Sequence, residues 1–348
     1  MKKRKSINDI AKELNVAIST VSAVLNGKAE ERRISAAMRD RVLAYARQSG
    51  YQPNMVARSL RTGKSKILGM LVEDIADPFF ATIARMVEKN AALHDYKLFY
   101  SSTENDPQNA KALIRAFRDR QVDGFIIAPT PGIEKEIQGL LADQIPLVLF
   151  DRYFPGIASN NVVVDNYEGA YKAARLFVEK GYQNIAFITL SSQQTQMSDR
   201  LKGYEAAIEE SRLAPSIYEI SYTLSDDILL KQIQYFLKDR PQIDAVLFAT
   251  NYLAINGLRA MSVLGKAVPN DIAVIGFDDN THFGLFSPSI TAIAQPIEEI
   301  STHIVKLLMN DLKASHLSQP IDVTKEIILK TTLIERQSSA QKKKKLAL

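Results

Sequence analysis

Cysteine is absent from this chain of 348 residues, and no run of apolar residues approaches the length of a membrane span. Without cysteine, the chain has neither a disulfide framework nor a thiolate metal site. A transmembrane helix needs ~18 or more consecutive apolar residues. Residues 1–5 are basic, but the apolar stretch of a secretory signal peptide does not follow them. We therefore expect a cytoplasmic protein that has no membrane partner.

The sequence also lacks the motifs of common enzyme classes. Gly63-Lys64-Ser65 has the ending of a phosphate-binding loop, but Arg58 stands where the loop requires its first glycine. The four histidines lack metal-ligand spacing, and no Gly-x-Ser-x-Gly nucleophile motif occurs. We therefore expect no catalytic residue, no metal and no cofactor. The missing phosphate-binding loop also argues against one alternative, a sugar kinase with a DNA-binding head.

Positive charge is concentrated near the N-terminus. Residues 1–66 hold 15 Lys and Arg against 5 Asp and Glu, a net charge of +10, whereas the whole chain carries +5. The remaining residues are therefore acidic, with a net charge of −5. This asymmetry indicates that the head of the chain binds a polyanion and that the body does not.

Short helices are expected over residues 6–61. Ser6 stands three residues before Asp9, which is the spacing of a capping box. Four apolar residues then share one helical face: Ile7, Ile10, Ala11 and Leu14. A second helix ends at Asn26-Gly27, and a third begins at Ser35 and ends before Gly50. Two short helices joined by a tight turn, with a third packed on them, form a small core.

From residue 67 onward, apolar runs of strand length alternate with amphipathic helical stretches. The expected strands are Ile67–Val72, Lys97–Ser101, Gly124–Ala128, Leu147–Phe150, Ile185–Thr189, Ala245–Ala249 and Ile272–Phe277. Continuous apolar strands that alternate with helices form parallel sheets covered on both faces. The number of such units fits two doubly wound, Rossmann-like lobes better than one.

A series of short strings carries a family resemblance. Residues 18–27, Ile-Ser-Thr-Val-Ser-Ala-Val-Leu-Asn-Gly, preceded by Asp9-Ile10-Ala11, strongly resemble the DNA-binding domain of the LacI/GalR family. The resemblance continues through Gly50–Asn54, Ala57–Leu60, Ile75–Phe80, Asp151-Arg152, Val164–Asn166, Gly169-Ala170, Arg200, Gly203-Tyr204 and Ile275–Asp279. A single string of this kind is weak, but this order along nearly the whole chain is specific.

The resemblance implies an all-α helix-turn-helix head followed by two α/β lobes of the periplasmic-binding-protein-like type I fold. The head would cover residues 1–53, and a hinge helix with its linker residues 54–65. The effector-binding domain would cover residues 66–336, with an N-lobe of about 66–164 and 293–322 and a C-lobe of about 165–292 and 323–336. Residues 337–348 are expected to form a disordered basic tail.

The resemblance also implies which residues bind double-stranded DNA. They are Ser6, Ile7, Ile18, Ser19, Thr20, Ser22, Ala23 and Asn26 in the head, and Asn54, Ala57 and Leu60 in the hinge. Ile18, Ser19 and Ala23 would read bases, whereas Thr20, Ser22 and Asn26 would hold phosphates. Leu60 would wedge into a base step of the minor groove beside the hinge helix of a second subunit. This pairing implies a homodimer on a near-palindromic operator, and residues 337–348 lack the leucine heptads of tetrameric relatives.

Three departures separate this head from many members of the family. Ala23 stands where many carry arginine, which removes a usual contact to guanine. Ala17 stands where many carry serine, which removes a helix N-cap. The loop at residues 29–33 is longer than in many relatives, and its Arg32 and Arg33 can contact phosphates. The operator of the family therefore cannot be assumed for this chain.

The lobes resemble periplasmic sugar-binding proteins, whose ligands lie between the lobes at the carboxyl ends of strands. The implied effector-binding residues are Phe79, Phe80, Asp151, Arg152, Arg200, Asn251 and Asp278. Asp151, Arg200 and Asp278 would bond vicinal hydroxyls, the two phenylalanines would form an aromatic wall, and Arg152 would orient Asp151. We expect Arg200 and Asp278 to lie in opposing walls of the cleft. Thr250-Asn251 replaces an Asn-Asp pair of many relatives, so the hydroxyl pattern read there differs.

Together these patterns predict a DNA-binding transcriptional regulator, a repressor, that a small-molecule effector switches. A sugar is the expected effector, and a purine or another non-sugar corepressor on the same architecture is the alternative. Whether the effector releases DNA or promotes its binding stays open. A periplasmic-type sugar-binding protein is the alternative class, against which the basic head and the missing signal peptide argue.

The alanine at position 23 generates a test of base reading. The Ala23→Arg variant should gain a preference for guanine at one base pair of each half-site, of about 1–3 kcal/mol, because arginine binds guanine through two hydrogen bonds. Random-site selection with both proteins measures this change. Identical consensus sites for the two proteins would show that residue 23 does not face the bases.

Overall fold

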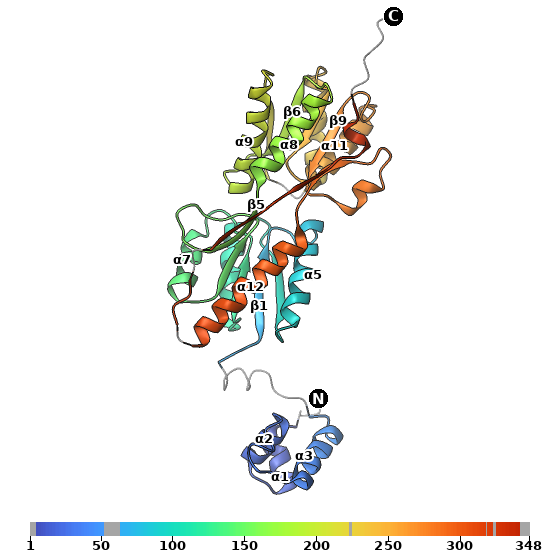
Figure 1. Ribbon diagram of the computed structural model, residues 1–348. Helices are drawn as coiled ribbons and strands as arrows, with labels where there is room; N and C mark the ends of the chain where they lie inside the picture. The colour runs from blue at the N-terminus through green and yellow to red at the C-terminus, as the bar shows by residue number, and fades with distance from the viewer. Residues whose placement is uncertain (1–4, 52–62, 223–224, 318, 323–324, 342–348) are drawn as a thin grey trace, which may run out of the picture. The chain divides into compact units, whose positions relative to one another are not determined.

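The computed structural model describes residues 5–51, 63–222, 225–317, 319–322 and 325–341 (Figure 1). The chain divides into two units, residues 1–65 and 66–348, and each is described by itself below. Within the described ranges, every helix is too short or too polar to cross a membrane.

The head is a bundle of three short helices. They are α1 (Ile7–Leu14), α2 (Ile18–Leu25) and α3 (Ala36–Gln48). The capping box forms as expected: the Asp9 N–H donates to Ser6 Oγ over 3.3 Å, and the Ser6 N–H donates to the Asp9 carboxylate over 2.7 Å. The small core consists of Ile10, Ala11, Leu14, Val21, Val24, Ala29, Val42 and Ala46. The predicted hinge helix, residues 54–60, lies outside the described residues.

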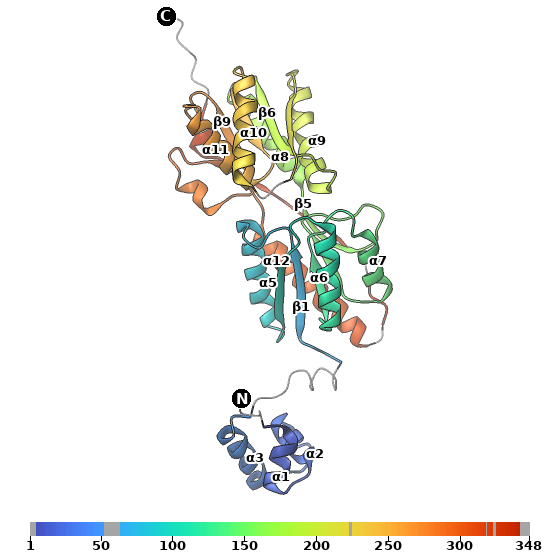
Figure 2. The ribbon, with the colours of Figure 1, turned by 180° about the vertical axis from the view of Figure 1, so that it is seen from behind.

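The N-lobe is a six-stranded parallel sheet with helices on both faces (Figures 1 and 2). Its strand order is β11-β5-β4-β3-β1-β2. These strands are β1 (Ile67–Val72), β2 (Lys97–Ser102), β3 (Gly124–Ile127), β4 (Leu147–Phe150), β5 (Asn160–Val164) and β11 (Glu326–Leu329). Helices α5 (Pro78–Ala92) and α12 (Ile297–His316) pack on one face. Helices α6 (Pro107–Asp119) and α7 (Glu134–Ala142) pack on the other.

The C-lobe repeats this topology with the strand order β12-β10-β9-β8-β6-β7. The strands are β6 (Ile185–Leu190), β7 (Ser216–Ile220), β8 (Ala245–Phe248), β9 (Ala273–Phe277), β10 (Thr291–Ala294) and β12 (Thr332–Ile334). The helices are α8 (Asn166–Glu179), α9 (Thr195–Glu210), α10 (Asp226–Asp239) and α11 (Asn251–Val263). The edge strand β12 pairs antiparallel to β10, whereas the sequence pattern predicts parallel sheets alone.

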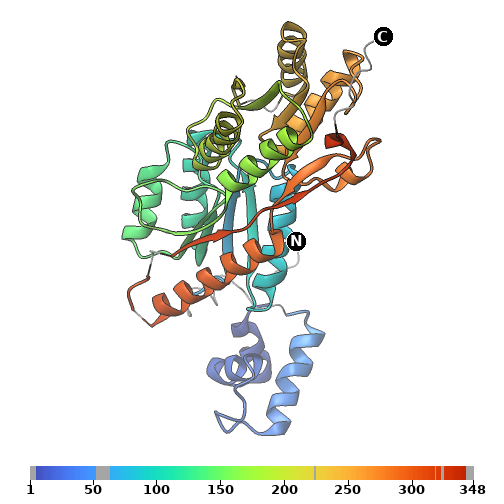
Figure 3. The same ribbon diagram turned by 45° about the horizontal axis from the view of Figure 1, so that its top comes forward.

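The chain crosses between the lobes three times, after β5, after β10 and after β11. The red segment in Figure 3 runs from β11 in one lobe to β12 in the other. The predicted lobe boundaries are wrong at two places. Strand β11 pairs with β5 in the N-lobe, although residues 323–336 are assigned above to the C-lobe, and Ile293 belongs to strand β10 of the C-lobe.

A pair of hydrogen bonds holds two of these crossings together. The Asp165 carboxylate accepts hydrogen bonds from the Thr331 N–H over 2.6 Å and from Thr331 Oγ1 over 2.7 Å. Asp165 precedes α8, but its side chain makes no capping bond to that helix. The first and third crossings are therefore held together at one point between the lobes.

The predicted disordered tail is wrong over residues 337–341. A short 3-10 helix, η2 (Gln337–Ser339), packs on the C-lobe with Ser338 and Ser339 fully buried. Ser338 Oγ donates to the Val274 carbonyl over 2.6 Å, and Tyr182 Oη donates to the Ala340 carbonyl over 2.7 Å. Residues 342–348 lie outside the described residues.

Gly203 allows α9 to lie against α8 and so generates a stability test. A Cβ at this position would lie 2.1 Å from the Tyr167 carbonyl oxygen. Because that atom belongs to the backbone, Gly203→Ala should lower the free energy of unfolding by about 1–3 kcal/mol in urea titrations. Gly139→Ala is the control: a Cβ at Gly139, in helix α7, meets nothing within 4 Å, so this variant should be as stable as the parent or more so. Equal stability of the two variants would contradict the close approach of α8 and α9.

Candidate functional site

Helix α2 of the head has one buried and one accessible side. Val21 and Val24 face the core, whereas Ile18 is 53% exposed at the start of the helix. All eight DNA-binding residues predicted in the head are exposed or half-buried; they are Ser6, Ile7, Ile18, Ser19, Thr20, Ser22, Ala23 and Asn26. An exposed isoleucine at a helix N-terminus is suited to an apolar contact with a base edge. The predicted Asn54, Ala57 and Leu60 lie outside the described residues.

Some of these side chains also stabilise the head itself. Ser6 caps α1, and Asn26 Nδ2 donates to the Ser22 carbonyl over 2.6 Å at the end of α2. Ala17, where many relatives have serine, is the N-cap residue of α2. It makes no side-chain capping bond, as the sequence analysis expects. The side chain of residue 17 therefore satisfies none of the first N–H groups of α2, and a phosphate is an acceptor that suits a helix N-terminus.

Two aspartates occupy equivalent positions in the two lobes of the body. Asp151 follows β4 and Asp278 follows β9, and both have left-handed backbone conformations with φ of 66° and 69°. Each N–H donates to a carbonyl of the neighbouring strand, Asp151 to Val162 over 3.1 Å and Asp278 to Ile293 over 2.9 Å. This conformation ends each strand sharply and places a carboxylate at the carboxyl edge of the sheet.

Arg200 lies in the C-lobe and is almost completely buried, with 1% of its surface exposed. Its Nε donates to Asn166 Oδ1 over 2.8 Å, and its Nη1 donates to the Ala249 carbonyl over 2.6 Å. The guanidinium also stacks over the Phe277 ring, 3.6 Å from its centroid, and Nη1 lies 3.8 Å from Asp278 Oδ2. Arg200 and Asp278 are therefore neighbours in one lobe. The expectation that they face each other across the cleft is wrong, because α9 and β9 belong to the same lobe.

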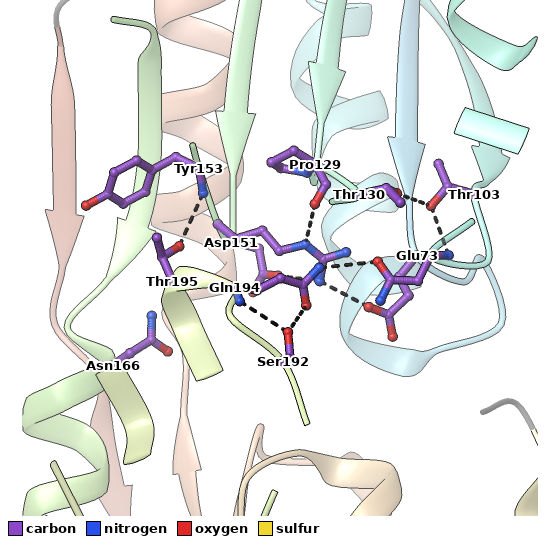
Figure 4. A network of polar contacts seen from close by, with 12 residues as sticks. Glu73, Thr103, Pro129, Thr130, Asp151, Tyr153, Asn166, Ser192, Gln194 and Thr195 are labelled. Carbon is purple, nitrogen blue, oxygen red and sulfur yellow. Dashed lines mark hydrogen bonds and ion pairs between the residues drawn. The ribbon is translucent and has the colours of Figure 1, made fainter. Parts of the chain in front are cut away.

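Arg152 provides the corresponding cation in the N-lobe. Its Nε donates to the Pro129 carbonyl over 2.9 Å, and its Nη1 donates to Glu73 Oε2 over 3.0 Å and contacts Asp151 Oδ2 at 3.4 Å. In Figure 4, Glu73 and Pro129 come from the N-lobe, whereas Gln194 and Ser192 come from the C-lobe. Arg152 thus contacts Asp151 and is itself held by Glu73.

The start of α5 brings two phenylalanines to the cleft. The Phe79 N–H donates to the N-cap residue Asp77 over 2.8 Å, and the Phe79 and Phe80 rings lie 5.1 Å apart, edge to face. Both are largely buried, and both belong to the core of the N-lobe. Asn251 reaches across from α11 of the C-lobe and donates to Asp77 Oδ2 over 3.3 Å. The lobes are therefore in direct contact at this point.

All seven side chains predicted to bind the effector line one cavity between the lobes. The lining also contains Thr250, which the sequence analysis discusses beside Asn251, and residues that it missed: Glu73, Asp77, Leu190, Gln194, Gln196, Met197 and Tyr252. Glu73 and Asp77 follow strand β1, so the rule that ligands lie at the carboxyl ends of strands could have identified them. The cavity has a volume of about 30 Å³, which is room for a few water molecules but not for a sugar ring. A larger ligand therefore requires the lobes to separate.

Carboxyl groups outnumber guanidinium groups in this cavity. Its described lining includes four carboxyl groups, Glu73, Asp77, Asp151 and Asp278, against the two guanidinium groups of Arg152 and Arg200. Burial raises the pKa of the Glu73, Asp151 and Asp278 carboxyls and lowers the pKa of Arg200. Burial and the nearby Asp278 carboxylate raise the pKa of Asp77 to about 7. The cavity therefore favours hydrogen-bond donors such as hydroxyl groups over anionic ligands.

Both units of the chain match known protein families. Residues 6–54 match the family model for bacterial regulatory proteins of the LacI family, and residues 174–339 match a periplasmic binding protein-like domain. The HTH-type transcriptional regulator RegA of Clostridium saccharobutylicum is 30% identical over 96% of this chain and 99% of its own length. The chain belongs to the LacI family of transcriptional regulators. A ribose operon repressor of Halalkalibacterium halodurans is also 30% identical, over 96% of this chain and 97% of its own.

Solved structures of the family have the same fold. The lac repressor dimer, bound to operator and an anti-inducer, superposes with a TM-score of 0.83 over 97% of this chain and 100% of its own, at 21% identity. A LacI family regulator from Enterococcus faecium with bound ribose superposes with a TM-score of 0.70 over 80% of this chain and 100% of its own, at 26% identity. The chain is therefore a DNA-binding regulator of transcription with a helix-turn-helix head and a two-lobed sensor.

The raised pKa of Asp77 generates a test of the charge balance in the cleft. Between its ordinary value of 3.8 and about 7, the folded protein holds a proton that the unfolded chain has released. The free energy of unfolding should therefore fall as pH rises through this window, and it should fall less steeply for Asp77→Asn. Urea titrations across the window measure both slopes. Asp239→Asn alters an exposed carboxyl and is the control; if both variants keep the parent slope, Asp77 does not hold the proton.

Proposed function

We propose that this regulator is a homodimeric repressor whose binding to a near-palindromic operator is switched by a small molecule in the interlobe cleft. The observation that supports this proposal best is a convergence of side chains. Four of the predicted effector ligands come from the N-lobe and three from the C-lobe, and all of them line the same cavity. A ligand bound there touches both lobes and can therefore change how they are arranged.

Three hydrogen bonds between the lobes are the contacts on which such a switch acts. Asn251 bonds to Asp77, Gln194 to Asn105 over 3.2 Å, and the Tyr153 N–H to Thr195 Oγ1 over 3.3 Å. An effector shifts the equilibrium between open and closed lobes only by the difference in its affinity for the two states. Hydroxyl groups that bond to Asp77 and Asn251 together would replace or reinforce one of these contacts.

A neutral sugar is the effector that the cleft chemistry favours. Sugar phosphates bring negative charge into a cavity where carboxyl groups already outnumber guanidinium groups. The relatives named for ribose, or solved with ribose bound, support a sugar as well. A purine is the second candidate, because Arg200, Asp278 and the two phenylalanines offer donors, an acceptor and aromatic faces to a base.

The head and the hinge supply the DNA-binding part of the proposal. Ile18, Ser19 and Ala23 on the accessible side of α2 would contact base edges, and a phosphate would bind at the start of the helix, which has no side-chain cap. Leu60 and its equivalent in the second subunit would wedge into the centre of the operator. Because the operator lies in the chromosome, the protein would act in the cytoplasm.

The test uses Asp278→Asn in place of an alanine variant of Arg200. Arg200 is fully buried and holds three parts of the C-lobe together, so Arg200→Ala would also lower folding stability. Asparagine at position 278 keeps the size of the side chain and loses the charge that strengthens a hydrogen bond to a ligand hydroxyl. A thermal-shift screen of ribose, glucose, galactose, fructose, their phosphates, guanine and hypoxanthine first selects the ligand.

Asp278→Asn should bind that ligand more weakly by about 1.5–3 kcal/mol, which is tenfold or more. If the ligand is an inducer, the variant should bind operator like the parent and fail to release it; if it is a corepressor, the variant should fail to bind operator. Operator titrations with and without ligand distinguish these cases. Asp143→Asn changes an exposed carboxyl and should leave the response intact. A full response in Asp278→Asn would remove Asp278 from the effector site.

A further inference from the structure

A second, larger groove opens beside the effector cavity. Its volume is about 700 Å³, against about 30 Å³ for the cavity itself. Residues 190–194 and Tyr222 of the C-lobe form one side. The N-lobe forms the other with residues 152–157, Asn105, Pro129, Pro131, Glu134 and Gln138. We propose that this groove binds the second ring of a neutral disaccharide or longer glycoside whose first ring occupies the effector cavity. The inference rests on the proposed sugar effector and extends it from a monosaccharide to an oligosaccharide.

The groove adjoins the effector cavity. Arg152, Leu190 and Gln194 line both of them. These three side chains separate the two spaces, so a linear ligand that displaces them as the lobes part can occupy both. At this junction Gln194 Nε2 donates to Asn105 Oδ1 across the lobes, and Ser192 Oγ donates to Gln194 Oε1 over 3.1 Å (Figure 4). Polar groups that already bridge the lobes thus surround the point where a glycosidic bond would lie.

One unsatisfied polar atom lies at this junction, and a second lies in the groove. Arg152 is 2% exposed, and its Nη2 has no hydrogen-bond partner among the described residues, although Nε and Nη1 are both bonded. The Tyr222 hydroxyl, on the other wall of the groove, is also buried and without a partner in the described chain. A buried donor without a partner costs about as much free energy as a lost hydrogen bond. A ligand hydroxyl or ring oxygen at the junction would supply the missing acceptor.

The lining of the groove matches the chemistry of a sugar ring. Tyr153, Phe154 and Tyr222 provide aromatic surface for the C–H side of a pyranose. Amide side chains supply paired donors and acceptors for hydroxyl groups, namely Asn105, Gln138, Gln193 and Gln194. Glu134 and Arg152 are the two formally charged side chains of the described lining, so the groove offers no cluster of cations for a phosphate. The occupant is therefore neutral and rich in hydroxyl groups.

Calorimetric titration of the full chain tests the inference. The probes are glucose with cellobiose and maltose, galactose with lactose and melibiose, and fructose with sucrose. At least one disaccharide should bind tenfold or more tightly than either of its component monosaccharides. In Tyr222→Ala this advantage should shrink about tenfold, because one aromatic contact and one hydrogen bond are lost, while the affinity for the monosaccharide stays unchanged. Tyr235→Ala, on the exposed side of α10, is the matched control and should change neither affinity.

The outcomes separate the groove from the effector cavity. If monosaccharides bind and every disaccharide binds equally or more weakly, the proposed groove subsite is wrong and the sugar effector stands. If no saccharide binds, both the proposal of a sugar effector and the proposal of a groove subsite are wrong. The comparison of mono- and disaccharides within the unaltered chain decides between these results even if Tyr222→Ala fails to fold. A disaccharide advantage that survives in a folded Tyr222→Ala would place the second ring elsewhere.

Discussion

The sensor depends on one buried guanidinium. Arg200 joins the start of α8 through Asn166, the end of β8 through Ala249 and the end of β9 through Phe277 and Asp278. Moving a charged group out of water costs several kcal/mol. The Arg200 guanidinium is stable in the core because its partners together replace the lost hydration. The same bonds set the position of Asp278 in the cleft. The fold of the C-lobe and the shape of the ligand site are therefore determined by the same interaction.

The sequence pattern predicted the strands that form long apolar runs and missed the shorter or more polar ones, which include three of the four edge strands. The seven strands expected from apolar runs all form, with ends shifted by a residue at most. Five strands were not expected: β5, β7, β10, β11 and β12. Strand β5 begins with Asn160 and Asn161, which are turn residues by propensity, and both become buried because Asn160 bonds to Asp311 and Asn161 to Ser159. Tertiary partners of this kind cannot be read from local sequence.

The residues of the cleft were predictable because the family resemblance assigns them, but their arrangement was not. All seven line one cavity, yet Arg200 and Asp278 are adjacent rather than opposed, since both α9 and β9 belong to the C-lobe. Glu73 and Asp77 were missed because a carboxylate after a strand is common as a helix cap, and Asp77 does cap α5. Glu73 and Asp77 differ from ordinary helix caps because their carboxyl groups are buried. That burial depends on the other lobe and on Arg152.

The three crossings between the lobes have a consequence for the evolution of this protein. Neither lobe corresponds to one uninterrupted stretch of its gene, since the N-lobe takes β1–β5, α12 and β11, and the C-lobe takes the segments between and after them. Recombination at a single breakpoint therefore cannot exchange one lobe for that of a relative. Exchanging a whole lobe requires three breakpoints, one at each crossing. New effector specificity in this architecture is more accessible by point substitution along the cleft than by shuffling of gene segments.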